Sequence, residues 1–489
     1  MEIISSIWEL LQGGLGNLAA YLAAHVLLCL LPAFFIAGGM TALIPKEAIT
    51  RFLGRNTPRF ISYPAAALAG SLLAVCSCTI VPLFAGIYKK GAGIGPAITF
   101  LFFAPAANIL ALSYTGIAIG MDLAVARLFL SLAFGIGIGM IMALIFNKQD
   151  AAHDKSTDAL FAGQGGMKRW SLVFLLLLVS LLLAGTFKVP LLTQTYGQVT
   201  LPALGLDRLE DYFFQLIPFD AVKGEEGVTA QGAILIGLLA LVGVTAWRGL
   251  NNILEGFNRW TWISLSLVGL TLLVGALGMD PEAGGLFIHF TGRFFGVAIL
   301  VIMIAVVGRT QLAARELQEW LWESWRFVKQ IFPLLIVGVF AVGLIRQIIQ
   351  PEWIQGLAGS NTLLGNLAGV VFGVFMYFPT LVEVPIAKMF LSLGMHRGPL
   401  LAYLMSDPEL SLQSVLIIST IIGRLRAWTY VGWVALFSAS AGLTYGAWID
   451  GAKGWLLGGY LILFLGILAL CLYLLGGRKL SVGTVSKFV

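Results

Sequence analysis

Residues 75–109 read VCSCTIVPLFAGIYKKGAGIGPAITFLFFAPAANI, and this stretch decides how the chain must fold. Cys76 and Cys78 lie one residue apart, Pro82 and Pro105 interrupt two apolar runs, and Asn108 follows the second interruption. A backbone in lipid must satisfy its own hydrogen bonds, so broken helices are tolerated mainly where they line a cavity. The stretch therefore predicts broken membrane helices around a substrate site.

The composition places this stretch in a polytopic, all-α membrane protein. The chain has 489 residues, of which 59% are hydrophobic and only 11% charged, whereas soluble domains carry about 25% charged residues. Glu2 and Glu9 stand where a signal peptide would be basic, so we expect the first apolar segment to be retained. The net charge of +6 comes from basic loops that suit a lipid bilayer with anionic head groups, and nothing indicates nucleic acid.

The cysteines do not form a disulfide framework. The four of them (Cys29, Cys76, Cys78 and Cys471) all lie in apolar segments, unlike those of small secreted domains. Cys76 and Cys78 are too close in sequence for an unstrained mutual disulfide. No cofactor is indicated.

Hydropathy predicts about thirteen membrane spans. The expected spans are 15–44 (with Pro32 as a kink), 61–88, 91–118, 119–146, 171–186, 231–247, 259–279, 288–308, 330–349, 362–388, 398–416, 417–446 and 454–476. Between them we expect a basic turn at 45–60, a flexible polar linker at 147–170 and a polar segment at 187–230. Residues 309–329, with Trp320, Trp322 and Trp325, are typical of a helix lying at the membrane interface.

The chain also repeats itself at an offset of 303 residues. Gly70 falls on Gly373, and the list of further matches is Pro82 on Pro385, Gly91 on Gly394, Pro96 on Pro399 and Pro105 on Pro408. We therefore predict a duplicated four-span unit with broken helices. The expected domains are a first repeat (1–146), a polar linker (147–170), an inserted membrane region (171–324), a second repeat (325–446), and a final span with tail (447–489). Whether the repeats are parallel or inverted stays open.

Paired broken helices predict a transport site near the bilayer midplane. The prolines Pro82, Pro105, Pro385 and Pro408 mark the breaks. The first half brings Cys76, Ser77, Cys78, Thr79 and Asn108, and the second brings Tyr377, Glu383, Asp407, Glu409 and Ser411. Thiolates favour soft centres, with Cys76 and Cys78 as the candidate metal ligands, while carboxylates favour hard cations or protons. We assign proton coupling to Glu383, Asp407 and Glu409.

Several of these side chains have a structural alternative. Glu383 could form an ion pair with Lys388 or Arg424, and Asp407 and Glu409 could cap a helix start. Two basic pairs at equivalent turns, Lys89-Lys90 and His396-Arg397, are expected to anchor at lipid head groups.

The motif resembles the ArsP-type permease family. The matching residues are Cys76-Ser77-Cys78-Thr79-Ile80-Val81-Pro82, Lys90-Gly91-Ala92, Gly95-Pro96-Ala97 and Ala104-Pro105-Ala106-Ala107-Asn108, with Thr79 and Ala104 at positions where family members usually have glycine. The resemblance covers about 240 residues in the two repeat units and leaves the middle spans outside. It implies efflux of trivalent organoarsenicals such as methylarsenite, with metal efflux in some relatives.

We therefore expect a secondary transporter that exports a small thiophilic solute, most simply a trivalent organoarsenical, across a prokaryotic plasma membrane. A copper or zinc efflux permease, or a permease for another sulfur- or metalloid-containing solute, stays open, as does homo-oligomerisation. An enzyme is disfavoured because the chain has no HExxH and only four histidines. It has no GxxxxGK[ST] motif either, so the energy must come from an ion gradient or from a partner ATPase.

Overall fold

The computed structural model describes residues 2–24, 28, 30–72, 77–107, 109–161, 168–186, 189–201, 228–282, 285–346, 351–375, 383–453 and 459. Within these ranges the protein is mostly helical, and seven helical stretches are long and apolar enough to cross a membrane. Shorter apolar helices, such as Leu31–Leu43 and Leu412–Ile422, accompany them. The polytopic membrane class is confirmed. The count of thirteen spans stays a prediction, and the expected span 454–476 lies outside the described residues apart from residue 459.

The chain begins with two helices where one span was expected at 15–44. Helix α1 covers Glu2–Ala24 and α2 covers Leu31–Leu43. Pro32 lies in the first turn of α2, where its missing N–H costs no hydrogen bond, so it starts a helix instead of kinking one. The predicted turn at 45–60 contains a further short helix, α3 (Lys46–Leu53).

Helices α4 (Arg59–Leu72) and α5 (Ser77–Lys89) replace the predicted span 61–88. The chain enters α4 and leaves α5 at the same end of the molecule. Gly93 N–H donates to Leu53 O over 2.8 Å, and Gly54 pairs with Ala92. Each helix is about 20 Å long at 1.5 Å per residue, too short for a hydrocarbon core of about 30 Å. The two helices form a re-entrant hairpin, so the prediction of a crossing at 61–88 was wrong.

The direction of α4 follows from its contact with α6 (Ile94–Ala106). Gly95 lies against the Tyr63 hydroxyl, and a Cβ on Gly70 would lie 3.1 Å from the Ala104 nitrogen. The two helices therefore run in the same direction, from their shared end toward the middle of the membrane. α7 (Ile109–Ala118) continues the crossing that α6 begins, and α8 (Met121–Ile145) crosses back.

The polar linker 147–170 begins with a helix, α9 (Asn147–Phe161), which was not expected. Asp150 accepts a hydrogen bond from Ile94 N–H over 3.0 Å, at the start of α6. His153 stacks on Tyr88 with ring centroids 4.2 Å apart. Contacts with α5 and α6 thus hold the first part of the linker as a helix, so it is not the flexible segment that its polar composition indicated.

In its described residues, the second half begins and ends with a long helix and has five short ones between them. They are α16 (Ala314–Arg346), α17 (Pro351–Ala358), α18 (Leu363–Phe375), α19 (Glu383–Ser392), α20 (Arg397–Leu410), α21 (Leu412–Ile422) and α22 (Arg424–Ile449). The predicted boundary between spans at 416/417 was wrong, because the helices change at Ser411 and Gly423.

The interface-lying helix predicted at 309–329 was also wrong. Most of this stretch is the first half of α16, which continues through Pro333 as one 33-residue helix. Trp320 donates to Phe35 O and Trp325 to Asn251 Oδ1, each over 2.8 Å, and both rings are buried. Contacts with α2 and the end of α13 therefore hold this amphipathic stretch inside the protein.

A turn in the first half recurs in the second with the same hydrogen bonds. Gly91 and Gly394 have φ of 89° and 91°, in the left-handed region that favours glycine. Each N–H donates over 3.0 Å to the carbonyl three residues back, and the next N–H reaches five residues back. Gly93 and His396 then begin α6 and α20 with extended backbone. These matches agree with the duplication read from the sequence.

The equivalent helices α8 and α22 lie side by side and run in opposite directions. At one end the Tyr445 hydroxyl donates to Asp122 Oδ2 over 2.8 Å. At the other end Arg426 Nε donates over 3.2 Å to Gln149 Oε1, just past the end of α8. α8 and α22 are therefore antiparallel neighbours.

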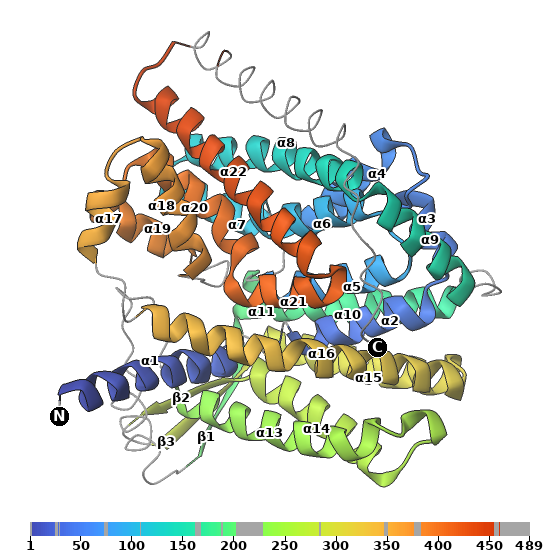
Figure 1. Ribbon diagram of the computed structural model, residues 1–489. Helices are drawn as coiled ribbons and strands as arrows, with labels where there is room; N and C mark the ends of the chain where they lie inside the picture. Colours follow the sequence, from blue (N-terminus) through green and yellow to red (C-terminus); the bar gives the residue numbers. More distant parts are fainter. Residues whose placement is uncertain are drawn as a thin grey trace.

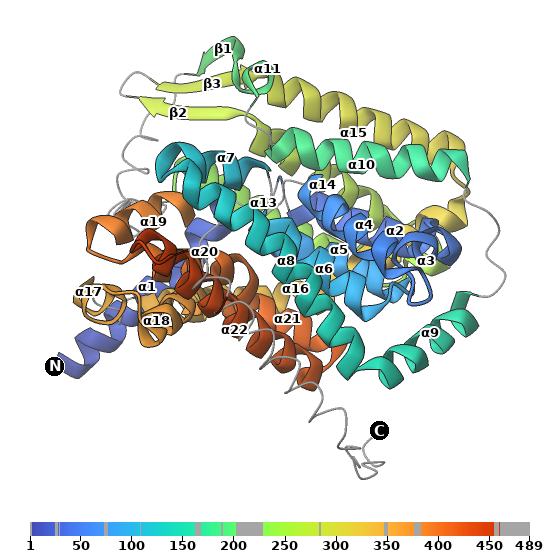
Figure 2. The same ribbon diagram turned by 90° about the horizontal axis from the view of Figure 1, so that it is seen from above.

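The inserted region packs along one side of these halves (Figure 1). It comprises α10 (Arg169–Thr186), α11 (Pro190–Thr193), α13 (Ala230–Leu250), the short 3₁₀ helix η2 (Ile253–Glu255), α14 (Arg259–Ala276) and α15 (Gly292–Gln311). Three antiparallel strands in the order β1-β3-β2 close one end: β1 (Thr195–Leu201), β2 (Gly278–Glu282) and β3 (Gly285–Thr291). The polar segment 187–230 contains β1, which was not foreseen. Figure 2 shows this sheet at the end opposite α9, and we call the two ends the sheet end and the α9 end.

Candidate functional site

Both halves contain a broken helix immediately after a proline. α6 ends at Ala106, one residue after Pro105, and Ala107 leaves the helical conformation at φ −132° and ψ 34°. α20 ends at Leu410, two residues after Pro408, and Ser411 is at φ −52° and ψ 138° before α21 begins. These breaks agree with the sequence prediction. Asn108 itself lies outside the described residues.

The other predicted breaks precede Pro82 and Pro385. Pro82 is the sixth residue of α5 and Pro385 the third residue of α19, so both lie in the first two turns of a helix that returns from a hairpin. The connecting residues 73–76 and 376–382, with Cys76 and Tyr377, lie outside the described residues. The backbone of Ser77, Cys78 and Thr79 forms the first turn of α5.

A fully buried ion pair joins the two halves. Arg127 Nη2, on α8, lies 2.6 Å from Glu383 Oε1, at the first residue of α19, and neither side chain is exposed. The structural partners considered for Glu383, Lys388 and Arg424, are therefore wrong, and the partner comes from the other half. A buried charge pair is costly to desolvate and contributes little net stability, so it favours a specific role.

The same arginine satisfies the break between α6 and α7. Arg127 Nε donates to Ala106 O over 2.8 Å, the last carbonyl of α6, and Nη1 donates to Thr115 Oγ1 of α7 over 3.3 Å. Carbonyls at a helix C-terminus carry partial negative charge, which a cation stabilises. The hairpin of the second half and the broken span of the first half thus meet at Arg127.

The sequence interpretation missed Arg127, although a signal was present. It stands inside the apolar run LAVARLFLSLAFG, and an ionisable residue in a membrane segment is a functional candidate by default. The internal repeat does not single it out, because the residue 303 positions later is Tyr430.

Asp407 is fully buried near the end of α20. A Cβ on Gly373 of α18 would lie 2.8 Å from the Asp407 nitrogen and 2.5 Å from Ser406 Oγ. Gly70 approaches Ala104 in the same way in the first half. The close approach of α18 and α20 holds the Asp407 backbone one turn before the break. The side chains of its neighbours Pro408 and Glu409, and that of Pro385, are not described.

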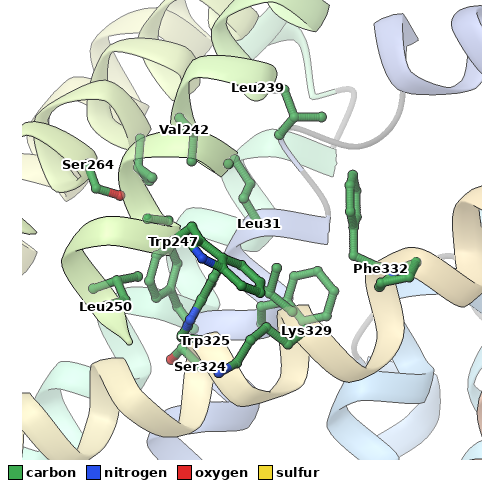
Figure 3. A pocket seen from close by; sticks show the side chains of 17 residues that line it. Leu31, Leu239, Val242, Trp247, Leu250, Ser264, Ser324, Trp325, Lys329 and Phe332 are labelled. Carbon is green, nitrogen blue, oxygen red and sulfur yellow. The ribbon is translucent and has the colours of Figure 1, made fainter. Parts of the chain in front are cut away.

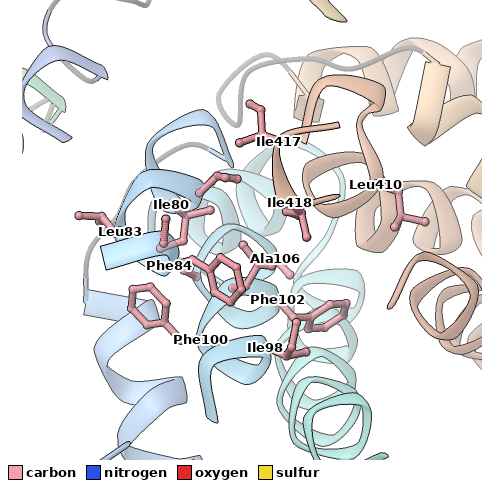
Figure 4. Packing of buried hydrophobic residues seen from close by; sticks show 14 of the residues in the cluster. Ile80, Leu83, Phe84, Ile98, Phe100, Phe102, Ala106, Leu410, Ile417 and Ile418 are labelled. Carbon is pink, nitrogen blue, oxygen red and sulfur yellow. The ribbon is translucent and has the colours of Figure 1, made fainter. Parts of the chain in front are cut away.

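The place equivalent to the ion pair is apolar in the other half. Ile80 corresponds to Glu383, Ile418 to Thr115 and Tyr430 to Arg127, and all three are at most 1% exposed. Figure 4 shows Ile80 of α5 beside Ile417 and Ile418 of α21. The two meeting points between the halves therefore differ in chemistry, one charged and one hydrophobic.

A polar cavity of about 580 Å³ opens beyond this hydrophobic contact, at the α9 end. Its walls carry Tyr88 and Lys89 of α5, His153 of α9 and Arg426 of α22. Lys89 Nζ lies 3.9 Å from the centre of the Phe327 ring. Lys90 is fully buried. The prediction that Lys89 and Lys90 anchor at head groups was wrong, because helices of both halves cover them.

At the sheet end Arg397 forms an ion pair with Asp122, with Nη1 3.0 Å from Oδ2. His396 caps α20 by accepting from Gly398 N–H, and its Nε2 lies 3.0 Å from Asp450 Oδ1. His396 and Arg397 therefore also join protein segments, and their contacts do not indicate the predicted role as anchors at lipid head groups. Among the described residues no group of three or more His, Cys, Asp or Glu side chains could hold a metal ion.

These features define a helical membrane protein in which short, broken helices from distant parts of the chain meet at a buried ion pair. A family model described as a predicted permease, ArsP_1, matches residues 13–447, and the chain belongs to this permease family. The match includes the inserted helices, so the expectation that the resemblance stops at the two repeat units was wrong.

Three related proteins support this membership. UPF0718 protein MJ0584 of Methanocaldococcus jannaschii is 34% identical over 447 residues, covering 91% of this chain and 98% of that protein. UPF0718 protein YcgR of Bacillus subtilis is 32% identical over 23% of this chain and 38% of that protein. UPF0718 protein YraQ of Escherichia coli is 28% identical over 24% of this chain and 34% of that protein. No solved structure matches the chain.

Proposed function

We propose that the protein is a secondary transporter in which a small solute binds where the hairpin of one half meets the broken span of the other. The observation that carries this proposal is the buried Arg127–Glu383 pair, which bonds both a hairpin helix and a freed helix carbonyl. Short helices, helix breaks and an ion pair at membrane depth recur where transporters bind their substrates. Membership of a permease family agrees with it.

The proposed cargo is a thiophilic solute, with a trivalent organoarsenical as the first candidate. Support comes from Cys76, which directly precedes α5 in the sequence, and from Cys78, the second residue of that helix. Ser77, Thr79 and Asn108 complete the proposed binding set of the first half, and Asp407 that of the second. Thiolates bind soft centres reversibly, which a carrier needs for release. Transition-metal ions are the alternative cargo.

Proton coupling is assigned to Glu383, with Asp407 and Glu409 as further carriers. Glu383 Oε2 is buried and has no hydrogen-bond partner among the described residues. A proton on Glu383 would remove its charge and so weaken its attraction to Arg127, which would keep the Ala106 carbonyl and the Thr115 hydroxyl as partners. Protonation could in this way loosen the contact between the halves, which is the step that alternating access requires.

The duplicated halves are proposed to be an inverted repeat, with the α9 end in the cytoplasm of a prokaryotic cell. Basic residues gather at that end: Lys46, Arg51, Arg55, Arg59, Lys148, Lys168, Arg169, Arg248, Arg259, Arg309 and Arg315. Cytoplasmic loops carry an excess of Lys and Arg, so this end faces inward. Export would then start from the polar cavity beside Lys89 and Arg426.

Resistance to methylarsenite in an arsenic-sensitive host tests the cargo. Cys76→Ser and Cys78→Ser should each abolish resistance, whereas Cys29→Ser and Cys471→Ser, in apolar segments away from the motif, should keep it. Uptake into everted vesicles then compares methylarsenite with Zn²⁺ and Cu⁺. Metal uptake without methylarsenite uptake would favour the alternative cargo, and unchanged resistance in both motif variants would exclude sulfur ligation.

A further inference from the structure

A second cavity, of about 460 Å³, lies away from the meeting points of the halves, between the inserted helices and the core (Figure 3). Helices α2, α13, α14 and α16 form its walls. The walls are almost entirely apolar, with Leu31, Leu239, Val242, Trp247, Val268 and Phe332 among the lining residues. Such a cavity suits a hydrocarbon chain.

One end of this cavity is cationic. Lys329 Nζ donates to Asn251 Oδ1 over 2.9 Å and lies 4.9 Å and 5.7 Å from the centres of the Trp322 and Trp325 rings. Trp325 Nε1 donates to the same Asn251 oxygen over 2.8 Å. An ammonium has three donors, so further N–H groups of Lys329 remain available for an anion.

The cationic end lies beside the end of α13, and the apolar walls follow that helix away from it. Lys329 contacts Asn251, immediately after α13 ends at Leu250. The walls follow α13 back to Leu239, about 16 Å at 1.5 Å per residue. A cationic group flanked by tryptophans at one end, with apolar walls leading away from it, matches an amphiphile that has an anionic head and a hydrocarbon tail.

One polar side chain in the cavity lacks a partner. Ser264 of α14 is 1% exposed, lines the cavity, and its hydroxyl has no partner among the described residues. A hydroxyl can donate to an oxygen atom, so this position suits an occupant that carries ester or phosphate oxygens as well as hydrocarbon.

We propose that this cavity binds one anionic phospholipid, with its phosphate at Lys329 and an acyl chain along α13. The charge of Lys329 selects an anionic head, and the depth of the cavity selects a long chain. The bound lipid fills the gap between the inserted region and the core, which the protein leaves open. This site is independent of the transport function proposed above.

The lipid site can be tested by native mass spectrometry of the detergent-purified full chain. The probes are 1-palmitoyl-2-oleoyl phosphatidylglycerol and the corresponding phosphatidylcholine. The wild type should retain one phosphatidylglycerol about fivefold more strongly than phosphatidylcholine, the preference that one Lys gives near an anionic lipid. Lys329→Gln should remove this preference while weak binding of both lipids remains.

Gly243 offers a variant that fills the cavity. It lines the cavity, and a Cβ there meets nothing within 4 Å, so the side chain of Gly243→Phe has room to start and should block both lipids. Gly237, on the same helix, is equally open but does not line the cavity, and Gly237→Phe is the matched control.

Three results would overturn the proposal. They are unchanged lipid retention in Gly243→Phe, equal loss in Gly237→Phe, and tighter retention of palmitate than of phosphatidylglycerol, which would make the ligand a free fatty acid. If Gly243→Phe fails to fold, Lys329→Gln decides, since a headgroup preference that survives it excludes the phosphate contact.

Discussion

Arg127 and Glu383 lie 2.6 Å apart with no exposure to solvent, and each belongs to a different half of the protein. Arg127 crosses from α8 to the first residue of α19 and also holds the last carbonyl of α6. One side chain therefore determines how a hairpin and a broken span fit together. The first and third of the following predictions test how the two halves are arranged, the second tests packing within the second half, and the fourth tests the contact between α9 and α6.

The first prediction concerns the ion pair. Arg127→Met or Glu383→Leu alone should destabilise the protein by about 3–5 kcal/mol, because each leaves an uncompensated buried charge. The double variant should recover most of this loss, since both charges are gone. Thermal unfolding in detergent measures all three. If the losses of stability in the two single variants simply add in the double variant, the two side chains do not interact. Transport should be lost in the double variant even though its stability returns.

The second prediction concerns the close approach of α18 and α20. Gly373→Ala should destabilise by about 1–3 kcal/mol, because its Cβ would lie 2.8 Å from the Asp407 backbone, which cannot move aside cheaply. Gly432→Ala, on α22, is the control, since a Cβ there meets nothing within 4 Å. Equal melting temperatures of the two variants would contradict this packing.

The third prediction concerns orientation. Asn56 and Ser360 follow the equivalent helices α3 and α17, both are exposed, and they lie at opposite ends of the molecule. A membrane-impermeant maleimide applied to intact cells should label Ser360→Cys but not Asn56→Cys, and everted vesicles should give the reverse. The unmodified chain serves as control for the native cysteines. Labelling of both from one side would rule out inverted halves.

The fourth prediction concerns pH. Burial raises the pKa of Asp150, and the Ile94 N–H and Arg55 offset this only in part. The folded protein therefore holds this proton to a higher pH than the unfolded chain, so stability falls as pH rises from about 3.8 through the raised pKa. Asp150→Asn keeps the oxygen that accepts from Ile94 N–H. Its melting temperature should exceed that of the wild type by an amount that grows as the pH rises through this range. A difference that is constant between pH 4 and 8 would exclude the effect.

The sequence was sufficient for the membrane class and for the breaks beside Pro105 and Pro408, because these follow from local chemistry. Hydropathy alone could not distinguish a crossing from a hairpin. Residues 59–89 hold enough apolar length for one span, and the contacts of Gly93 with Leu53 and of Gly54 with Ala92 show that the chain returns to the end it entered. Because such a return cannot be read from hydropathy, the orientation of the halves could not be derived from counting spans.

The candidate site was predictable in part. Glu383 stood out because an acid between two valines in an apolar run is costly. Its partner could not be paired with it, since Arg127 comes from the other half and the contact depends on how inverted units dock. Local patterns also failed for Trp320 and Lys90, whose amphipathic surroundings indicated a membrane surface although helices from distant parts of the chain bury them.

The shortness of the hairpin helices has a consequence for any solute. α4, α5, α18 and α19 are 10 to 14 residues long, so none reaches farther than about 20 Å into a hydrocarbon layer of about 30 Å. Gly93 N–H donates to Leu53 O at the outer end of one hairpin and His396 N–H to Ala358 O at the outer end of the other, so each hairpin begins and ends on one side. A solute that moved along one hairpin alone would therefore still have about a third of the hydrocarbon layer to cross.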